Sequence, residues 1–148
     1  MNQNSLFGAL GPALLILLAS GCDTRDGGAT GPEGLQGTAW VAEDIEGRGV
    51  IDMLQSTLEF QEPGQAGGNA GCNRYFGSVS LNGNEVTFGQ MGSTRKMCAP
   101  AIMDQEQKFL AALGAARTWE IRNGLLYLRD DAQDVVLRFS AKKNPATP

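Results

Sequence analysis

The chain has 148 residues, with 12 basic and 16 acidic side chains, no histidine and a formal charge of −4. A chain of this length forms one domain or two small ones. The lack of histidine excludes Ser-His-Asp and Cys-His catalytic pairs and histidine-ligated metal sites, and the acidic balance argues against nucleic acid as a partner.

The first 21 residues carry no ionisable side chain. Their apolar run over residues 6–19 is shorter than the ~20 residues that span a bilayer, but it suits the apolar region of a signal peptide. The run ends in Leu-Ala-Ser-Gly-Cys22, which resembles a bacterial lipobox. The resemblance implies a signal peptide over residues 1–21 and an acylated Cys22, which would hold the protein on a membrane.

We therefore expect a bacterial cell-envelope protein that faces the periplasm and is lipid-anchored to the inner or the outer membrane. Two alternatives remain open, namely an uncleaved anchor and an ordinary secretory signal in which Cys22 is incidental. Residues 22–34 are polar and glycine-rich and predict a flexible tether. Residues 141–148 predict a disordered tail, so that a single domain is expected over residues 35–140.

Most of this domain predicts short strands, because apolar and polar residues alternate. Asn82-Gly-Asn84 and Asn123-Gly124 predict hairpin turns, since Asn and Gly accept positive φ, whereas the glycine-rich segment Glu62–Gly68 predicts a loop. The predicted strands are Thr38–Ile45, Thr57–Phe60, Ser78–Leu81, Glu85–Phe88, Trp119–Ile121, Leu125–Leu128 and Val135–Phe139.

One amphipathic helix is predicted. Pro100 suits its first turn, Gly114 suits its end, and an apolar stripe recurs at helical spacing between them. The run contains Ile102, Met103, Glu106, Phe109, Leu110 and Leu113, whose apolar members form the stripe; Asp104, Gln105, Gln107 and Lys108 are expected mostly off it. The sequence thus predicts the α+β class, with antiparallel hairpins and one packed helix.

Two segments are more specific than these patterns. They read Gly-Cys-Asn-Arg-Tyr-Phe-Gly over 71–77 and Ser-Thr-Arg-Lys-Met-Cys-Ala-Pro over 93–100. With the Gln-Glu and Phe-Leu pairs of the predicted helix, they resemble the META domain of the heat-shock protein HslJ family, over about residues 35–139.

The resemblance implies a curved antiparallel sheet, a partial β-barrel, that is closed by a helix. It also implies a small envelope lipoprotein connected with heat shock and novobiocin tolerance. No catalytic residues are established for this domain, so its motif residues enter without an assigned role. They are Gly71, Asn73, Arg74, Gly77, Thr94, Arg95 and Met97.

Cys72 and Cys98 are the only thiols left once Cys22 is acylated. An exported chain meets an oxidising compartment, so we expect them to form a disulfide that stabilises the fold by roughly 3–4 kcal/mol in the chain-entropy model. The alternative is a pair of free buried cysteines. The chain has no Cys-x-x-Cys spacing, which would suggest a redox role. Two cysteines without a histidine are too few ligands for a zinc site.

Each polar motif residue has a functional and a structural interpretation. Asn73 and Arg74 could contact a ligand, but we favour Asn73 capping a bend and Arg74 pairing with a carboxylate such as Glu106. Thr94 and Arg95 could bind an anion, but a bend of solvated residues is favoured. The glycines of the first motif, Gly71 and Gly77, are expected at a bulge or a close chain approach.

The expected function is a non-catalytic, stress-related binding or assembly factor. We expect a monomer without metal or cofactor, whose partners are the membrane and an envelope protein or apolar ligand. One alternative is a carrier whose ligand lies among Trp40, Phe60, Phe88, Phe109 and Trp119, although a domain this small favours a dry core. The other is a periplasmic enzyme inhibitor that uses the Glu62–Gly68 loop.

Overall fold

The computed structural model of the chain describes residues 34–143. The predicted signal peptide, Cys22 and nearly all of the tether lie outside these residues. Within them, nine strands and one helix confirm the α+β class. The elements are β1 (Ala39–Ile45), β2 (Thr57–Glu59), β3 (Gln65–Asn69), β4 (Arg74–Asn82), β5 (Glu85–Phe88), β6 (Gly92–Ser93), α1 (Pro100–Ala115), β7 (Thr118–Arg122), β8 (Leu125–Arg129) and β9 (Val135–Ala141).

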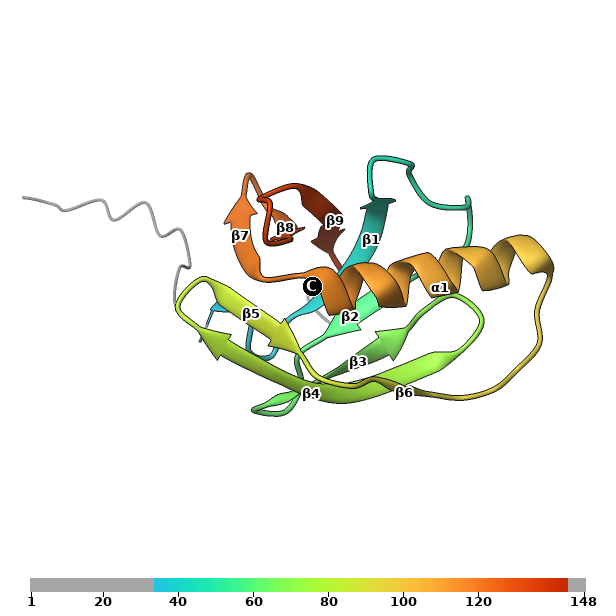
Figure 1. The fold of residues 1–148 in the computed structure, drawn as a ribbon, viewed down its shortest axis with the longest axis horizontal. Coiled ribbons are helices and arrows are strands. Elements are labelled where there is room, and N and C mark those ends of the chain that lie inside the picture. Colours follow the sequence, from blue (N-terminus) through green and yellow to red (C-terminus); the bar gives the residue numbers. More distant parts are fainter. Residues whose placement is uncertain (1–33, 144–148) are drawn as a thin grey trace, which may run out of the picture.

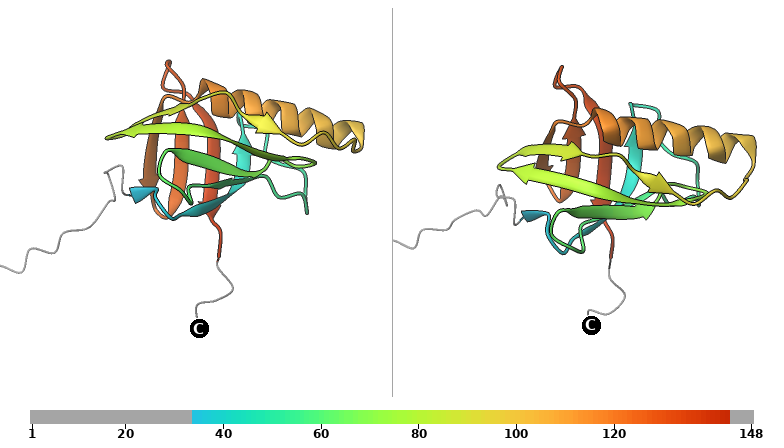
Figure 2. Two further views of the ribbon diagram at one scale, coloured as in Figure 1. Left: turned by 90° about the horizontal axis from the view of Figure 1, so that it is seen from below. Right: turned by 60° about the horizontal axis from the view of Figure 1, so that its bottom comes forward.

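The strands form one curved antiparallel sheet in the order β3-β2-β1-β9-β8-β7-β5-β4-β6. Because β3 also pairs with β4, the sheet closes partly into a ring (Figure 1). This arrangement confirms the curved sheet that the family resemblance implies. Figure 2 shows the same ring from below, with the helix lying along one side of it.

The ring has two thin seams. A single residue pair, Glu59 with Gly67, joins β2 to β3, and a single pair, Glu85 with Thr118, joins β5 to β7. The seams divide the sheet into a five-strand half, in the order β2-β1-β9-β8-β7, and a four-strand half in which β3, β5 and β6 all pair with β4. Both predicted motif segments begin or end in the four-strand half.

Helix α1 holds the two halves together. It packs against β1 and β9 of the five-strand half and against β5 of the four-strand half. Its buried Phe109 makes edge-on contacts with Tyr75 of β4 and Phe139 of β9, with ring centroids 5.7 Å and 6.2 Å apart. Such aromatic pairs add to the free energy gained by burial alone, so Phe109 links the halves through the core.

Both predicted hairpin turns are present. β4 ends in the pair Asn82 with Glu85, and β7 ends in the pair Arg122 with Leu125. Asn123 and Gly124 both have positive φ, 53° and 75°, as a type I′ turn requires.

The predicted loop over Glu62–Gly68 is wrong for its second part, because Gln65–Asn69 forms β3 and pairs with β4 at every residue. Because glycine has no side chain, this strand does not show the alternation of apolar and polar residues that predicts a strand. A Cβ on Gly68 would lie 2.3 Å from the carbonyl oxygen of Thr57, so glycine is what lets β2 and β3 approach. The protruding loop needed by an inhibitor is therefore much shorter than expected.

Two details of the predicted helix are also wrong. Gly114 does not end α1, which continues to Ala115; the extended Ala116 ends it, and its N–H bonds to the carbonyls of Ala112 and Leu113. Gln105, expected off the apolar stripe, is 7% exposed. It faces inward because its side chain has polar partners there.

Candidate functional site

The fold brings the two motif segments together. Tyr75 and Phe76 of β4 pair with Ser93 and Gly92 of β6. Beyond this ladder, Cys72 and Cys98 form a disulfide with a Cα–Cα distance of 6.0 Å, as the sequence predicts. The segment that leads into α1 is thus fixed to the start of β4.

A buried carboxylate lies at the centre of this junction. Glu106 of α1 is 6% exposed, and its Oε2 accepts hydrogen bonds from the backbone N–H groups of Cys72 (3.1 Å) and Asn73 (2.6 Å). Its Oε1 accepts one from Asn73 Nδ2 at 2.8 Å. Three N–H donors therefore solvate this carboxylate, and no Lys or Arg of the described residues lies within 4.0 Å of it.

Asn73 extends the network to the second motif. Its Oδ1 accepts hydrogen bonds from Thr94 Oγ1 (2.9 Å) and from the backbone N–H of Lys96 (2.7 Å). Its Nδ2 also donates to the carbonyl of Lys96 at 3.2 Å. Thr94 Oγ1 in turn accepts the N–H of Arg74 at 3.2 Å. We call Asn73, Thr94 and Glu106 the polar cluster.

The polar cluster corrects one prediction and supports another. Arg74 does not pair with Glu106, because Asn73 and the adjoining backbone occupy that carboxylate. Asn73 does hold a bend, as favoured. Thr94 has a structural role, since its hydroxyl bridges Asn73 and Arg74.

A neighbouring residue ties a second loop to the helix. Gln105 Oε1 accepts the backbone N–H of Ile51 at 2.7 Å, and Gln105 Nε2 contacts Ser56 Oγ at 3.4 Å. Ser56 Oγ donates in turn to the carbonyl of Ala70. Gln105 thus fixes the β1–β2 loop. This role could not be predicted from the sequence, because its partners lie about fifty residues away in the chain.

The two motif glycines serve the backbone in different ways, and the predicted close chain approach is present at Gly77. Gly71 has a φ of 134°, a conformation that residues with a Cβ rarely adopt. A Cβ on Gly77 would lie 2.5 Å from Met91 Sδ and 2.8 Å from the carbonyl oxygen of Gln90. Both glycines therefore serve the backbone.

The remaining motif side chains lie on the surface. Arg74, Arg95 and Lys96 are exposed, and the exposed fractions of Phe76 and Met97 are 66% and 89%. Phe76 was missed by the sequence analysis, although a buried Tyr75 on a strand predicts an exposed neighbour. Its ring lies over Gly92, where a Cβ would be 3.4 Å from the ring.

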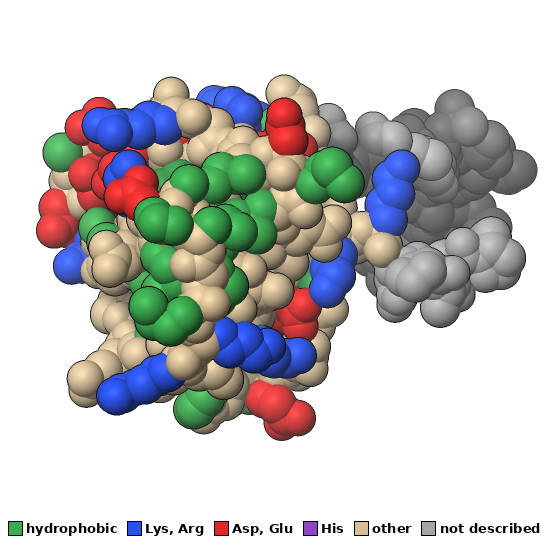
Figure 3. Space-filling model, turned by 90° about the vertical axis from the view of Figure 1, so that its right-hand side faces the viewer, with side chains coloured by type: hydrophobic (Ala, Val, Ile, Leu, Met, Phe, Trp, Pro, Cys, Tyr) green, Lys and Arg blue, Asp and Glu red, His purple; other side chains and the backbone are tan. Residues whose placement is uncertain are grey.

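Apolar side chains also gather at the end of the molecule where α1 begins. Figure 3 faces this end and shows an apolar patch with basic side chains beside it. Met97 precedes α1, and the nearby β1–β2 loop carries exposed Ile51 and Met53. Monomeric proteins often use such patches for contacts with other molecules.

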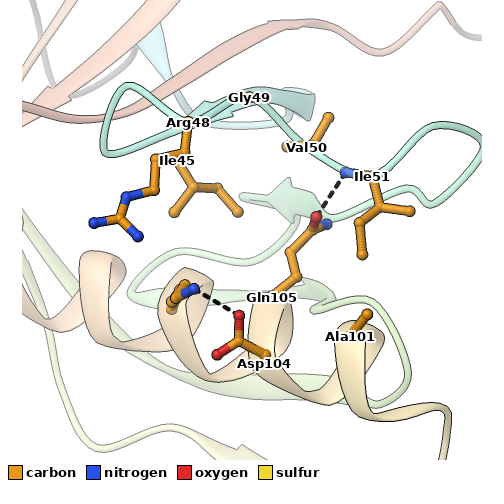
Figure 4. Close-up of a pocket in the computed structure, with 9 residues that line it drawn as sticks. Ile45, Arg48, Gly49, Val50, Ile51, Ala101, Asp104 and Gln105 are labelled. Atoms are coloured by element: carbon orange, nitrogen blue, oxygen red, sulfur yellow. Dashed lines mark hydrogen bonds and ion pairs between the residues drawn. The ribbon is translucent and has the colours of Figure 1, made fainter.

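A hollow of about 340 Å³ lies between the β1–β2 loop and α1 (Figure 4). Ile45, Val50 and Ile51 form its apolar part. Two of its polar side chains already have partners, because Lys108 Nζ bonds to Asp104 Oδ2 at 2.6 Å and Gln105 bonds to Ile51. Within residues 34–143, Arg48 is left as a cation of this hollow with no carboxylate oxygen within 4.0 Å.

The five aromatic residues proposed to line a carrier cavity belong to the buried core instead. Trp40, Phe60, Phe88, Phe109 and Trp119 are each at most 6% exposed. The buried Tyr75 donates its O–H to the carbonyl of Thr57 at 2.7 Å. Burial, with the nearby Glu59 charge, raises the pKa of this phenol, so it stays neutral.

Residues 34–143 contain no cluster of three or more His, Cys, Asp or Glu that could hold a metal ion. Over the same range, the helix is neither long nor apolar enough to cross a membrane.

Several known proteins are similar to this chain in sequence or in fold. The META domain family model matches residues 33–143. Heat shock protein HslJ of Escherichia coli (strain K12) is 36% identical over 86 residues, which cover 57% of this chain and 61% of HslJ. The matched part is therefore about three fifths of that relative's length.

Two solved NMR structures are similar in fold. One is 27% identical, with a TM-score of 0.59, and the alignment covers 74% of this chain and 92% of that protein. The other, from Burkholderia xenovorans, is 24% identical, with a TM-score of 0.63 and coverage of 97% and 100%. The second likeness concerns the fold alone.

Proposed function

Because the chain belongs to the META domain family, we propose that it is a stress-associated protein of the bacterial cell envelope. In this proposal the acylated Cys22 anchors it to a membrane, and the domain binds a partner without catalysis. The name of the relative HslJ supports the association with heat shock. The sequence Leu-Ala-Ser-Gly-Cys22 supports the anchor.

One observation carries the binding role, namely the division of the motif into buried and exposed parts. Asn73 and Glu106 are buried and satisfied by each other and by the backbone. Phe76 and Met97 are large, apolar and exposed. A rigid support beneath exposed side chains lowers the entropy lost on binding, so the motif is built for recognition.

Photo-crosslinking in living cells tests this role. A crosslinking amino acid at Phe76 or Met97 should capture one specific envelope protein, more strongly after heat stress. The matched control carries the same amino acid at Asn123, an exposed turn position in the five-strand half. Equal capture from all three positions would contradict the proposed surface.

The anchor has a separate test. The mass of the protein extracted from membranes should equal that of residues 22–148 plus a diacylglyceryl group and one further acyl chain at most. Cys22→Ala should abolish the added mass and release the protein into the soluble fraction. A soluble, unacylated wild-type protein would contradict the anchor and leave the binding role intact.

A further inference from the structure

A polar hollow of about 350 Å³ lies beside the disulfide, between β2, the end of β3 and the start of β4. Its size falls within the range of small-molecule sites. It is lined by Gln55, Thr57, Glu59, Gly68, Asn69, Cys72, Arg74, Lys96 and Lys142.

The charge of this hollow is opposite to that of the chain. It contains three cationic side chains and the single carboxylate of Glu59, whereas the whole chain carries −4. Lys142 Nζ contacts Glu59 Oε1 at 2.9 Å. Within residues 34–143, Arg74 and Lys96 have no carboxylate oxygen within 4.0 Å, so two positive charges are uncompensated.

Four other hollows of the described residues have a smaller imbalance, with at most one more cationic than anionic side chain in their lining. The one beside α1 has two cations, but its Lys108 is already paired with Asp104. The one below Phe76 shares Arg74 but contains two carboxylates, Glu59 and Glu62. Arg74 lines both hollows, and cationic side chains outnumber carboxylates only in the one that it shares with Lys96.

The donors present suit an oxyanion with several oxygens. Arginine presents a planar fork of N–H donors that binds phosphate with two parallel hydrogen bonds, and lysine adds a point charge. Asn69 adds an amide: its Oδ1 accepts the N–H of Gly71 at 2.9 Å, and its Nδ2 has no hydrogen-bond partner in the described part of the chain.

The backbone that carries the two cationic side chains is also held in place. The backbone of Lys96 makes two hydrogen bonds to the Asn73 side chain, and the backbone of Arg74 makes two to Thr94. The Cys72–Cys98 disulfide joins the two segments. Preorganisation of this kind strengthens binding, because less conformational entropy is lost.

We propose that this hollow binds a phosphate-class oxyanion, with Arg74 and Lys96 as its principal ligands. The inference rests on the proposed binding role, because both residues belong to the exposed motif, and it adds the chemical class of the ligand. It corrects the structural interpretation of Arg74, whose expected partner Glu106 is occupied by Asn73.

Calorimetry with the full-length protein in a neutral detergent tests the site, with glycerol phosphate as the probe at low ionic strength. Arg74→Gln and Lys96→Gln should each weaken binding at least tenfold, which corresponds to about 1.4 kcal/mol. Arg95→Gln is the matched control, because Arg95 is exposed one residue away but does not line the hollow. It should change affinity less than threefold.

A second arm identifies the source of the phosphate. If a lipid headgroup is the ligand, vesicles of phosphatidylcholine with phosphatidylglycerol should bind the Arg74→Gln variant less well than the wild type. Free glycerol phosphate should bind in the first arm if a soluble phosphate is the ligand. Either result supports the site, and both variants are checked for native circular dichroism.

The proposal is overturned if neither probe binds in a manner that depends on Arg74 and Lys96. It is also overturned if Arg95→Gln weakens binding as much as Arg74→Gln, since the effect would then reflect surface charge alone. These outcomes are independent of the crosslinking experiment. Specific capture of a protein at Met97 without phosphate binding would leave the proposed function intact and remove only this inference.

Discussion

The two halves of the sheet are stabilised in different ways. The five-strand half is built from long hairpins over an apolar interior in which Leu126, Leu128 and Leu137 are fully buried. Its ion pairs, such as Arg129 with Glu120, lie at the surface. The four-strand half has a glycine-rich strand, a disulfide and the buried carboxylate of Glu106 at its junction with α1.

We infer that the five-strand half mainly stabilises the fold, whereas the four-strand half carries the side chains proposed for recognition. The five-strand half is held by regular strand pairing over its apolar interior, both in the local β7–β8 and β8–β9 hairpins and between the distant strands β1 and β9. The four-strand half is fixed by groups more than twenty residues apart, as in the bonds of Asn73 to Lys96 and Glu106. It thereby holds an irregular backbone rigid, and Arg74, Phe76 and Met97 stay free on its surface.

The largest expected effect comes from removing the buried carboxylate. Glu106→Ala leaves the N–H groups of Cys72 and Asn73 without an acceptor, and each unsatisfied buried donor costs ~1–3 kcal/mol. We expect the free energy of unfolding in urea to fall by about 3–5 kcal/mol. Glu120→Ala in the other half should cost less than about 1 kcal/mol; equal losses would contradict the comparison.

The next effect comes from the disulfide. The double variant Cys72→Ala, Cys98→Ala should lose roughly 3–4 kcal/mol of unfolding free energy in the chain-entropy model. Urea denaturation of both proteins, with the wild type measured with and without reductant, checks this value. Reduced wild type that keeps its full stability would show that the polar cluster alone holds the two motif segments.

Two glycine substitutions should act in opposite directions. Gly77→Ala would place a methyl group 2.8 Å from the carbonyl oxygen of Gln90, and overpacking of this kind costs ~1–3 kcal/mol. Gly114→Ala lies inside α1, has no atom within 4 Å of the added Cβ and should stabilise by about 0.5–1 kcal/mol. Thermal unfolding distinguishes them, and a stabilising Gly77→Ala would contradict the close approach.

The smallest effect depends on pH. A hydrogen bond from Arg129 lowers the pKa of Glu120, and the charges of Arg122 and Arg129 add to this, although partial burial opposes it. A lowered pKa in the folded state contributes stability above the unfolded pKa, and this contribution is lost as pH falls through the folded value. Arg129→Gln should cost ~0.2–1 kcal/mol at pH 7.

The difference between Arg129→Gln and the wild type should vanish in acid, below the pKa of Glu120. Urea denaturation at pH 7 and in acid checks this dependence. A difference that persists unchanged in acid would mean that Arg129 acts through packing instead of charge.

Local patterns in the sequence predict most of the fold. The Asn-Gly turns and the alternation of Val135–Phe139 place the hairpins, and Pro100 places the start of α1. β3 escaped prediction because glycines have no hydrophobic pattern, and its pairing comes from β4. The motif predicts where the site lies, but the roles within it depend on partners distant in the chain.

Gln105 and Glu106 illustrate that limit. Both are polar helix residues whose partners, Ile51 and Asn73, come from other loops. Arg74 shows the reverse case, since a carboxylate in the sequence suggested a partner that Asn73 occupies. A sequence shows which residues have opposite charges, but it does not show which of several donors will occupy a given carboxylate; that requires the structure.

The place of β9 has a consequence for biosynthesis. It lies between β1 and β8, and its last residue, Ala141, pairs with Trp40 near the beginning of the domain. Contacts between such distant residues slow folding. The central pairing of the five-strand half therefore cannot form until β9 has been synthesised, so the sheet is completed late and β1 waits for its partner.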